Sequence, residues 1–389
     1  MTTIYREIEF ENNPSKVCYS GQLLKGKAQI YLPVDTHVKA IYITFSGEGF
    51  CQWSENVDGE QITGSKIYLN ERVNLLSNSS QADIVVPAGN HSYPFQVQFR
   101  PRLPTSYEGT YGHIRYISTL HIDRSSKKLD PFTETFTVIN PLNLDNNSSY
   151  RMPLEVRQCT KFNQFCLLFC WKTDDLEIFG KLPVRGYCPG QTMNLKLDVV
   201  NKSGQDILHF AVQFVQEVTY TANNGQQKLE RIVQSTKLTD GCRADRHNLQ
   251  SIKVNTLVPS LPPTNFSADV CGSRYMFVII AYTEICRRNV TFEIPVIIGT
   301  YPISNEFYSP SENVTNQTTV LPSAPQIDGY AYGSNISINS SSDLPPYPEA
   351  DPPTYEEATR SILDVTPQQN FVPKYPTYRR QTSYATEEP

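Results

Sequence analysis

Residues 187–200 read YCPGQTMNLKLDVV, and residues 19–32 read YSGQLLKGKAQIYL. Each stretch begins with an aromatic residue, passes through a short turn that contains glycine, and enters a strand-like run through a glutamine. Glycine accepts turn conformations that other residues avoid, and an apolar period of two is typical of a strand with one buried face. The two stretches lie 168 to 169 residues apart, about the length of one large sandwich domain. This spacing indicates either a duplicated domain or a coincidence of turn chemistry, since short glycine turns are common.

Strand patterns fill the chain around these two stretches, up to about residue 300. Apolar residues alternate or run together over short segments, and clusters of Gly, Pro, Asn and Asp separate them. No stretch combines a 3.6-residue apolar period with helix caps. Many short strands with turns between them favour antiparallel β-sandwiches. The predicted strands are Lys27–Leu32, Val38–Phe45, Tyr93–Phe99, Thr192–Val200, Ile207–Thr221 and Phe292–Ile298.

The composition agrees with an all-β fold and limits the number of domains. A length of 389 residues suggests two domains and a tail. Aromatic residues make up 11% of the chain, and together with abundant Val, Ile and Thr they suit pleated sheets better than helices. The segment Leu142–Lys161, which is polar and then turns apolar, is the natural connection between the domains. We therefore predict two sandwiches, at residues 1–155 and 156–303, and a tail at residues 304–389.

The chain changes character after Pro302. Thirteen of the 28 prolines lie in the last 89 residues, where four basic and eleven acidic residues give a net charge of −7. Because this segment also lacks apolar periodicity, it cannot bury enough surface to fold alone, and we predict that it is disordered. The rest of the chain carries +2. A near-neutral body without a clustered basic surface argues against a nucleic-acid-binding protein.

The sequence also bears on the cellular compartment. Residues 1–11 have no apolar core of a signal peptide. The longest apolar runs, Cys166–Trp171 and Tyr275–Tyr282, are too short to cross a membrane. Nine cysteines are scattered without a framework, so we expect free thiols in a reducing cytosol.

Common catalytic and metal-binding patterns do not occur in the sequence. The six histidines form no H-E-x-x-H or zinc-finger pattern, and there is no P-loop, G-x-G-x-x-G or G-x-S-x-G sequence. Buried thiols explain Cys166 and Cys170 better than a metal site, because no second pair of ligands follows. A weaker interpretation is redox signalling through a reactive thiol such as Cys242 or Cys271. We predict a protein that is not an enzyme, with no catalytic residue, no metal site and no cofactor.

A small basic cluster follows a predicted strand, and it consists of Arg124, Lys127 and Lys128. Such a group could contact phosphate on phosphorylated tails or on inositol lipids. The alternative is a solvated loop, which is the more common fate of a short charged run.

The tail contains the sharpest motif of the chain, Pro352-Pro353-Thr354-Tyr355. The two prolines favour a polyproline II helix that stacks in the aromatic groove of a WW domain, and the tyrosine fills a second pocket. The segment Leu344-Pro345-Pro346-Tyr347 lies just upstream and is either a second docking site or part of a proline-rich run. The predicted WW-binding residues are Pro352, Pro353 and Tyr355, with Leu344, Pro345 and Tyr347 at the second site.

Several stretches together resemble a known family. The most specific is Leu103–Gly109 with Gly112–Tyr116, supported by residues 87–95, 186–191 and 294–300. In these stretches the chain resembles the arrestin-domain-containing proteins, the α-arrestin family. The resemblance implies two tandem arrestin-type antiparallel β-sandwich domains of immunoglobulin-like form, followed by the disordered tail.

The resemblance also implies a function. It implies a cytoplasmic adaptor that recruits WW-domain HECT ubiquitin ligases to membrane receptor or transporter cargo, so that the cargo is ubiquitinated, internalised and sorted. It further implies peripheral association with the plasma membrane and endosomes. One departure is that the tail has a single strict PPxY sequence, where many relatives have two. The alternative is a trafficking or signalling scaffold that uses the arrestin fold without a ligase.

Overall fold

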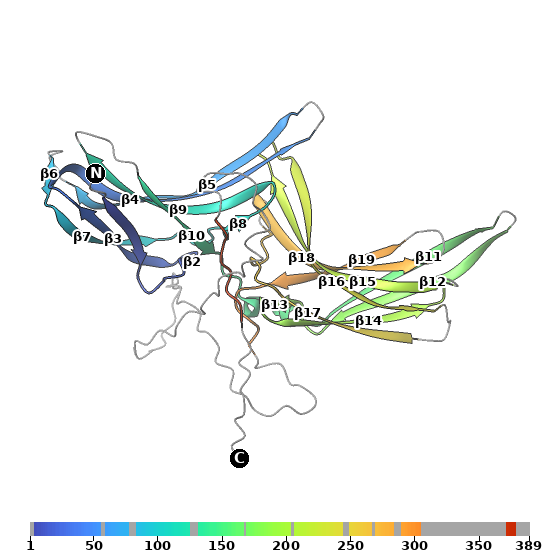
Figure 1. Ribbon diagram of the computed structural model, residues 1–389. Helices are drawn as coiled ribbons and strands as arrows, with labels where there is room; N and C mark the ends of the chain where they lie inside the picture. Colours follow the sequence, from blue (N-terminus) through green and yellow to red (C-terminus); the bar gives the residue numbers. More distant parts are fainter. Residues whose placement is uncertain are drawn as a thin grey trace, which may run out of the picture.

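The computed structural model describes ten segments of the chain, within which it has nineteen strands, one 3₁₀ helix and one short α-helix (Figure 1). The side chains of residues 161–174 are outside this description. The described segments are residues 4–55, 59–77, 83–124, 131–166, 169–203, 206–243, 249–266, 269–283, 289–304 and 371–378.

The first sandwich is built from ten strands. They are β1 (Tyr5–Phe10), β2 (Val17–Tyr19), β3 (Leu23–Leu32), β4 (Thr36–Ser54), β5 (Gln61–Ser77), β6 (Ile84–Val86), β7 (Gly89–Gln98), β8 (Tyr107–Glu108), β9 (Gly112–Arg124) and β10 (Phe132–Ile139). A three-stranded sheet has the order β1-β3-β7. A seven-stranded sheet has the order β2-β10-β9-β4-β5, with β6 paired to β4 and β8 paired to β9. All these pairs are antiparallel except β2 with β10, which is parallel.

The second sandwich repeats this plan with nine strands. They are β11 (Leu154–Cys166), β12 (Phe169–Leu182), β13 (Gly186–Tyr187), β14 (Thr192–Asn201), β15 (Ile207–Thr221), β16 (Gln227–Cys242), β17 (Leu249–Leu257), β18 (Cys271–Thr283) and β19 (Val290–Ile298). Its sheets have the orders β11-β12-β14-β17 and β13-β19-β18-β15-β16. Here too the short strand at the sheet edge, β13, pairs in parallel, with β19.

Each sandwich buries an apolar core between its two sheets because its strands alternate. Strand β3 buries every second side chain, and β19 does the same. In the first core Phe45 packs against Phe95 and Phe136, with ring centroids 5.7 and 6.3 Å apart. In the second core Phe214 packs against Phe277 at 5.6 Å. Each fully buried ring of this kind stabilises the fold by about 1.5–3 kcal/mol relative to exposure.

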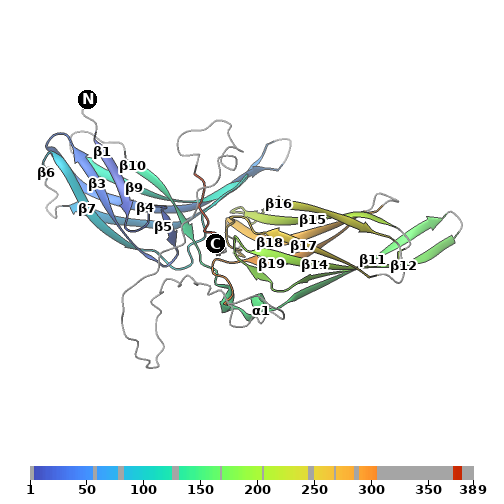
Figure 2. The same cartoon turned by 60° about the horizontal axis from the view of Figure 1, so that its bottom comes forward.

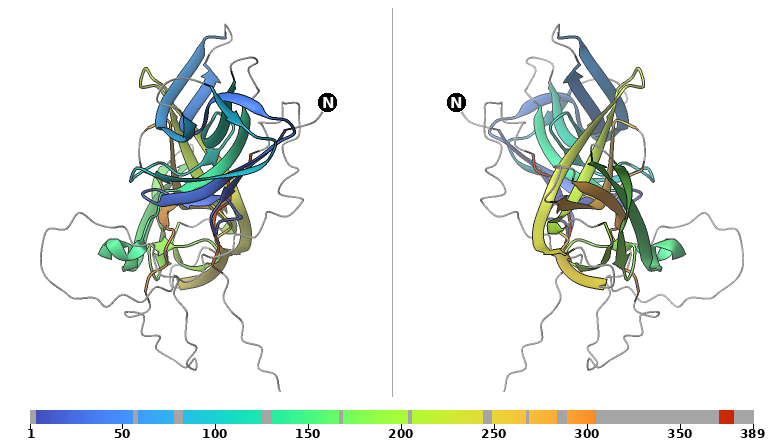
Figure 3. Two further views of the ribbon diagram at one scale, coloured as in Figure 1. Left: turned by 90° about the vertical axis from the view of Figure 1, so that its left-hand side faces the viewer. Right: turned by 90° about the vertical axis from the view of Figure 1, so that its right-hand side faces the viewer.

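The structure confirms the predicted all-β class, and five of the six predicted strands lie wholly within a strand, while Tyr93–Phe99 extends one residue beyond the end of β7 at Gln98. The predicted connection, Leu142–Lys161, is shorter than expected. It consists of a 3₁₀ turn η1 (Leu144–Asn146) and helix α1 (Ser148–Arg151), after which β11 already begins at Leu154. The apolar residues at the end of the predicted connection therefore belong to a sheet. Helix α1 lies at the flank of the molecule, outside both sandwiches (Figure 3), and no helix in the described segments is long and apolar enough to cross a membrane.

Candidate functional site

The two turns that open the sequence comparison have the same geometry. Gly21 and Gly190 adopt φ values of +82° and +88°. In both turns the side-chain oxygen of the next residue accepts a backbone N–H at 2.8 Å: Gln22 from Tyr19, and Gln191 from Cys188. The strands that lead into the turns, β2 and β13, lie on either side of the junction between the sandwiches (Figure 1). The repeat is therefore a true structural duplication, with an offset of 169 residues at the glycines.

A second pair of equivalent features lies beside these turns. The buried hydroxyl of Tyr116 donates to the carbonyl oxygen of Pro104, and that of Tyr275 donates to Pro262, both at 2.7 Å. Each tyrosine thus holds a Leu-Pro segment against the strand that carries it. The hydroxyls that follow these segments accept strand N–H groups at 2.9 Å, Ser106 from Val138 and Thr264 from Ile298.

The two sandwiches form a continuous junction. The N–H of Asn223, in the turn after β15, donates to the carbonyl oxygen of Thr63 on β5, and its side chain accepts from the N–H of Ser65. Lys66 of β5 pairs with Asp269 at 2.7 Å. Five residues of the second half join the core of the first sandwich: Val218, Tyr220, Ala222, Val270 and Cys271. The apolar contact, backbone hydrogen bonds and ion pair together make this junction a packed interface.

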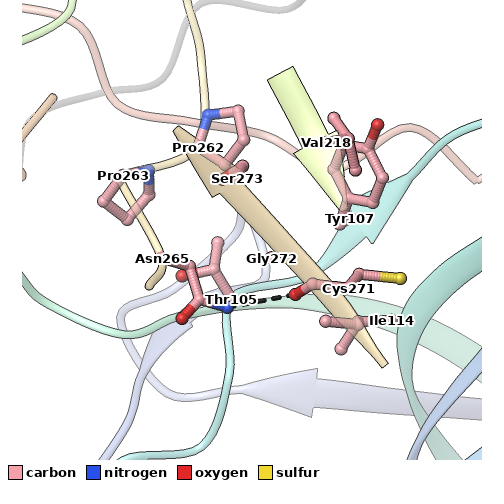
Figure 4. Close-up of a pocket in the computed structure, with 10 residues that line it drawn as sticks. All are labelled: Thr105, Tyr107, Ile114, Val218, Pro262, Pro263, Asn265, Cys271, Gly272 and Ser273. Carbon is pink, nitrogen blue, oxygen red and sulfur yellow. Dashed lines mark hydrogen bonds between the residues drawn. The ribbon is translucent and has the colours of Figure 1, made fainter. Parts of the chain in front are cut away.

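A chain of hydroxyl groups crosses the junction next to a small pocket. The hydroxyls of Tyr107 and Tyr220 lie 3.4 Å apart, and Tyr220 donates to Glu230 at 2.7 Å. Burial raises the pKa of both tyrosines, so both stay neutral and can donate. Figure 4 shows the pocket, where Asn265 donates to the carbonyl oxygen of Cys271 at 3.1 Å. Its walls combine Tyr107 and its neighbours from the first sandwich with prolines from the second, so it is a feature of the junction rather than of either sandwich.

The second sandwich has a buried carboxylate on β15, in the part of the strand that lies towards the junction. Glu217 is fully buried, and it accepts hydrogen bonds from Arg231 at 2.8 Å and from Arg274. Arg231 also pairs with Glu293 at 2.8 Å. A buried charge needs such partners because water no longer solvates it. This cluster holds β15, β16, β18 and β19 in register on the outer face of their sheet.

Most residues that the sequence singled out lie outside the described segments. These are Lys127 and Lys128 and all six predicted WW-binding residues, Pro352, Pro353, Tyr355, Leu344, Pro345 and Tyr347. Arg124 is the last residue of β9 and pairs with Val38 of β4. The structure therefore gives the position of one member of the basic cluster and does not bring the cluster together.

The cysteines give little support to metal or redox chemistry. Within the described segments no group of three or more His, Cys, Asp or Glu side chains could hold a metal ion. Cys166 and Cys170 lie on β11 and β12, where the register pairs Cys166 with Phe169 and Phe165 with Cys170. Cys242 and Cys271 are both buried, and burial raises the pKa of Cys271, which disfavours the reactive thiolate.

One segment at the junction was not singled out by the sequence. Residues 371–378 read FVPKYPTY, and they lie against both sandwiches. A compositional signal was present: three of the four basic residues of the tail fall at positions 374–380, and no acidic residue lies between 371 and 380. In an acidic tail, such an aromatic and basic stretch is a local exception.

Comparisons with known proteins agree with this architecture. Residues 6–145 match the family Arrestin (or S-antigen), N-terminal domain, and residues 172–303 match Arrestin (or S-antigen), C-terminal domain. The chain is 27% identical to human arrestin domain-containing protein 1 over 82% of its own length and 70% of that protein. It is 24% identical to arrestin domain-containing protein 17 of Caenorhabditis elegans, over 75% of its length and 69% of that protein. It is 23% identical to human thioredoxin-interacting protein, over 74% and 72%.

Proposed function

Because the chain belongs to the arrestin-domain-containing proteins, the α-arrestin family, we propose that it is an adaptor that recruits WW-domain HECT ubiquitin ligases to membrane receptor or transporter cargo. The observation that carries this proposal is the sequence Pro352-Pro353-Thr354-Tyr355, in the segment that follows two arrestin-type sandwiches. The ligase performs the chemistry, and the adaptor supplies proximity between ligase and cargo. Ubiquitination, endocytosis and endosomal sorting of the cargo follow.

The arrangement of the chain supports this division of labour. We place the division between the sandwiches at the start of β11, two residues before the predicted boundary between residues 155 and 156, and the ligase-binding tail at residues 304–389. A proline-rich peptide binds a WW groove at little entropic expense when it is already extended and exposed. The packed junction supports the body as a single unit that presents cargo. Leu344, Pro345 and Tyr347 are proposed as a second site for the same partner, which would raise the avidity for a ligase with several WW domains.

The proposal includes a peripheral association with the plasma membrane and endosomes, where the cargo resides. Arg124, Lys127 and Lys128 are the proposed contacts for phosphate groups at these membranes. Arg124 is the last residue of β9 and is only half-buried, which suits a contact outside the core.

Capture of the ligases tests the proposal. The full-length protein should retain WW-domain HECT ligases, and the double variant Tyr355→Ala with Tyr347→Ala should lose at least about tenfold of this binding, because both aromatic anchors are removed. Tyr330→Ala is the matched control, since Tyr330 is a tail tyrosine with no proline in the three positions before it. Equal retention by the double variant and the control would instead favour the ligase-independent scaffold.

A further inference from the structure

Residues 371–378, here called the tail clamp, lie across the junction of the two sandwiches, where they are drawn in red (Figure 2). On the first sandwich the N–H of Lys374 donates to the hydroxyl of Thr137 at 3.1 Å. The Lys374 ammonium group donates to the carbonyl oxygen of Ser15 at 3.3 Å. The hydroxyl of Tyr375 donates to the carbonyl oxygen of Ser106 at 2.8 Å. One short stretch of chain therefore contacts three separate parts of the first sandwich.

The tail clamp contacts the second sandwich as closely. The hydroxyl of Ser260 donates to the carbonyl oxygen of Tyr375 at 2.9 Å. The N–H of Tyr378 donates to Pro189 at 2.9 Å, and its hydroxyl donates to the carbonyl oxygen of Thr300 at 2.5 Å. Tyr375 thus binds both sandwiches at once, through its side chain on one and its backbone on the other.

The acceptors for the tail clamp are fixed by the sandwiches themselves. Ser106 exchanges two hydrogen bonds with Val138 of β10, from backbone to backbone at 2.8 Å and from backbone to side chain at 2.9 Å. Pro189 belongs to the turn that the Gln191 side chain braces. A site whose groups are held in place before binding loses little entropy when its ligand arrives. The carbonyl oxygens of Ser106 and Pro189 are therefore preformed acceptors, for the Tyr375 hydroxyl and the Tyr378 N–H.

Gly190 gives the site its shape. A Cβ atom at this position would overlap the carbonyl oxygen of Tyr378 and also approach its backbone nitrogen. The backbone of the tail clamp thus fills the space that a side chain would take. Two prolines, Pro373 and Pro376, flank Tyr375 and favour an extended chain, which lowers the entropy lost on docking.

We propose that the junction is a binding site for a tyrosine-rich extended peptide, and that the occupant is the chain's own segment 371–378, which fastens the two sandwiches to each other. The N–H of Ser304, at the end of the second sandwich, is held by the Asp145 carboxylate at 3.1 Å. Docking therefore anchors residues 305–370, which contain both predicted WW motifs, at both ends. The proposal does not depend on any ligase, so its test and the capture experiment can fail separately.

Hydrogen exchange of the full-length protein tests the proposal, because the amides of Lys374 and Tyr378 donate in the docked state. We expect both amides to exchange at least about tenfold more slowly than in a free peptide FVPKYPTY. Gly190→Ala should abolish this protection. Tyr375→Ala should abolish it too, and this substitution alters no residue of either sandwich. Exchange at the free-peptide rate in the unaltered protein would overturn the proposal.

Two controls make the result specific. Gly225 has a φ of +85°, close to that of Gly190, but a Cβ atom there meets no atom of the described segments within 4 Å. Gly225→Ala should therefore keep the protection, which separates loss of the site from backbone strain. Tyr384→Ala, outside the tail clamp, should also keep it. Protection that survives Gly190→Ala would mean that the tail clamp binds at another site. Protection that increases with protein concentration would mean that a second copy of the chain supplies the segment. Either result overturns the proposal.

Discussion

The turn at Gly21 and the turn at Gly190 have the same backbone and the same bracing glutamine, but different surroundings. A Cβ atom at Gly21 would meet only the Cα of Pro101, at an ordinary contact distance of 3.8 Å. At Gly190, the same space is taken by the backbone of Tyr378. Duplication of a domain therefore made two equivalent turns, and among the described residues the tail covers only the turn at Gly190. Equivalence of local structure does not extend to what each half binds.

The same lesson holds for charged positions. Glu48 of β4 is opposite Arg115, and Glu217 of β15 is opposite Arg274, one residue before the equivalent tyrosines Tyr116 and Tyr275. Glu48 is exposed, whereas Glu217 is fully buried between two arginines. In the first half Arg115 pairs instead with Glu108, at 2.5 and 2.7 Å. Both halves thus place a glutamate opposite an arginine at equivalent positions, but the glutamate is exposed in the first half and buried in the second.

The largest expected difference between the halves is at these glutamates. Glu217→Gln should lower the free energy of unfolding by about 2 kcal/mol, because it removes a buried charge that two arginines require. Glu48→Gln should change it by less than about 0.5 kcal/mol, as expected of an exposed position. Urea unfolding of the two variants measures both values. Similar losses would mean that the buried cluster does not distinguish the second half.

The tyrosines should instead give equal effects. Tyr116→Phe and Tyr275→Phe each leave a buried proline carbonyl without its donor and should each lower the free energy of unfolding by about 1.5 kcal/mol. The same denaturation assay applies, with Tyr5→Phe as a control at an exposed tyrosine. A clearly smaller loss at one of the two positions would show that the duplicated segments are not held with equal strength.

The smallest expected effect is a pH response confined to the first half. Burial and the neighbouring Arg115 lower the pKa of His113 to about 4, and the equivalent position opposite β15 is Gly272. Since the unfolded chain protonates near pH 6.5, the free energy of unfolding should fall as the pH drops from there towards 4. Between pH 7 and pH 5 we expect a loss on the order of 1 kcal/mol from this group.

His113→Phe should remove this part of the pH dependence while keeping a ring beside Phe50, whose centroid lies 5.8 Å away. His37→Phe, at an exposed histidine, is the control. If stability between pH 7 and pH 5 changes equally in the unaltered protein and in His113→Phe, the histidine does not cause the response.

The sequence predicted the fold well because the features that determine it are local. The glycine turns, the alternation along β3 and the high aromatic content each report on their own few residues. The burial of Glu217 could not be predicted, because the arginines that cover it, Arg231 and Arg274, come from β16 and β18 rather than from its own strand. Docking of residues 371–378 was missed for a related reason, since its acceptors at Ser106, Pro189 and Thr300 are far away in the sequence.

The shared core has a consequence for the order of synthesis. All strands of the first sandwich have been synthesised once Ile139 is made, but part of its apolar cluster comes from residues 218–222 and 270–271. The first sandwich must therefore wait for much of the second before its core is closed. The bridge between Asn143 and Tyr301 forms later still. Because the tail clamp needs finished acceptors from both sandwiches, its docking marks the moment at which the nascent body is complete.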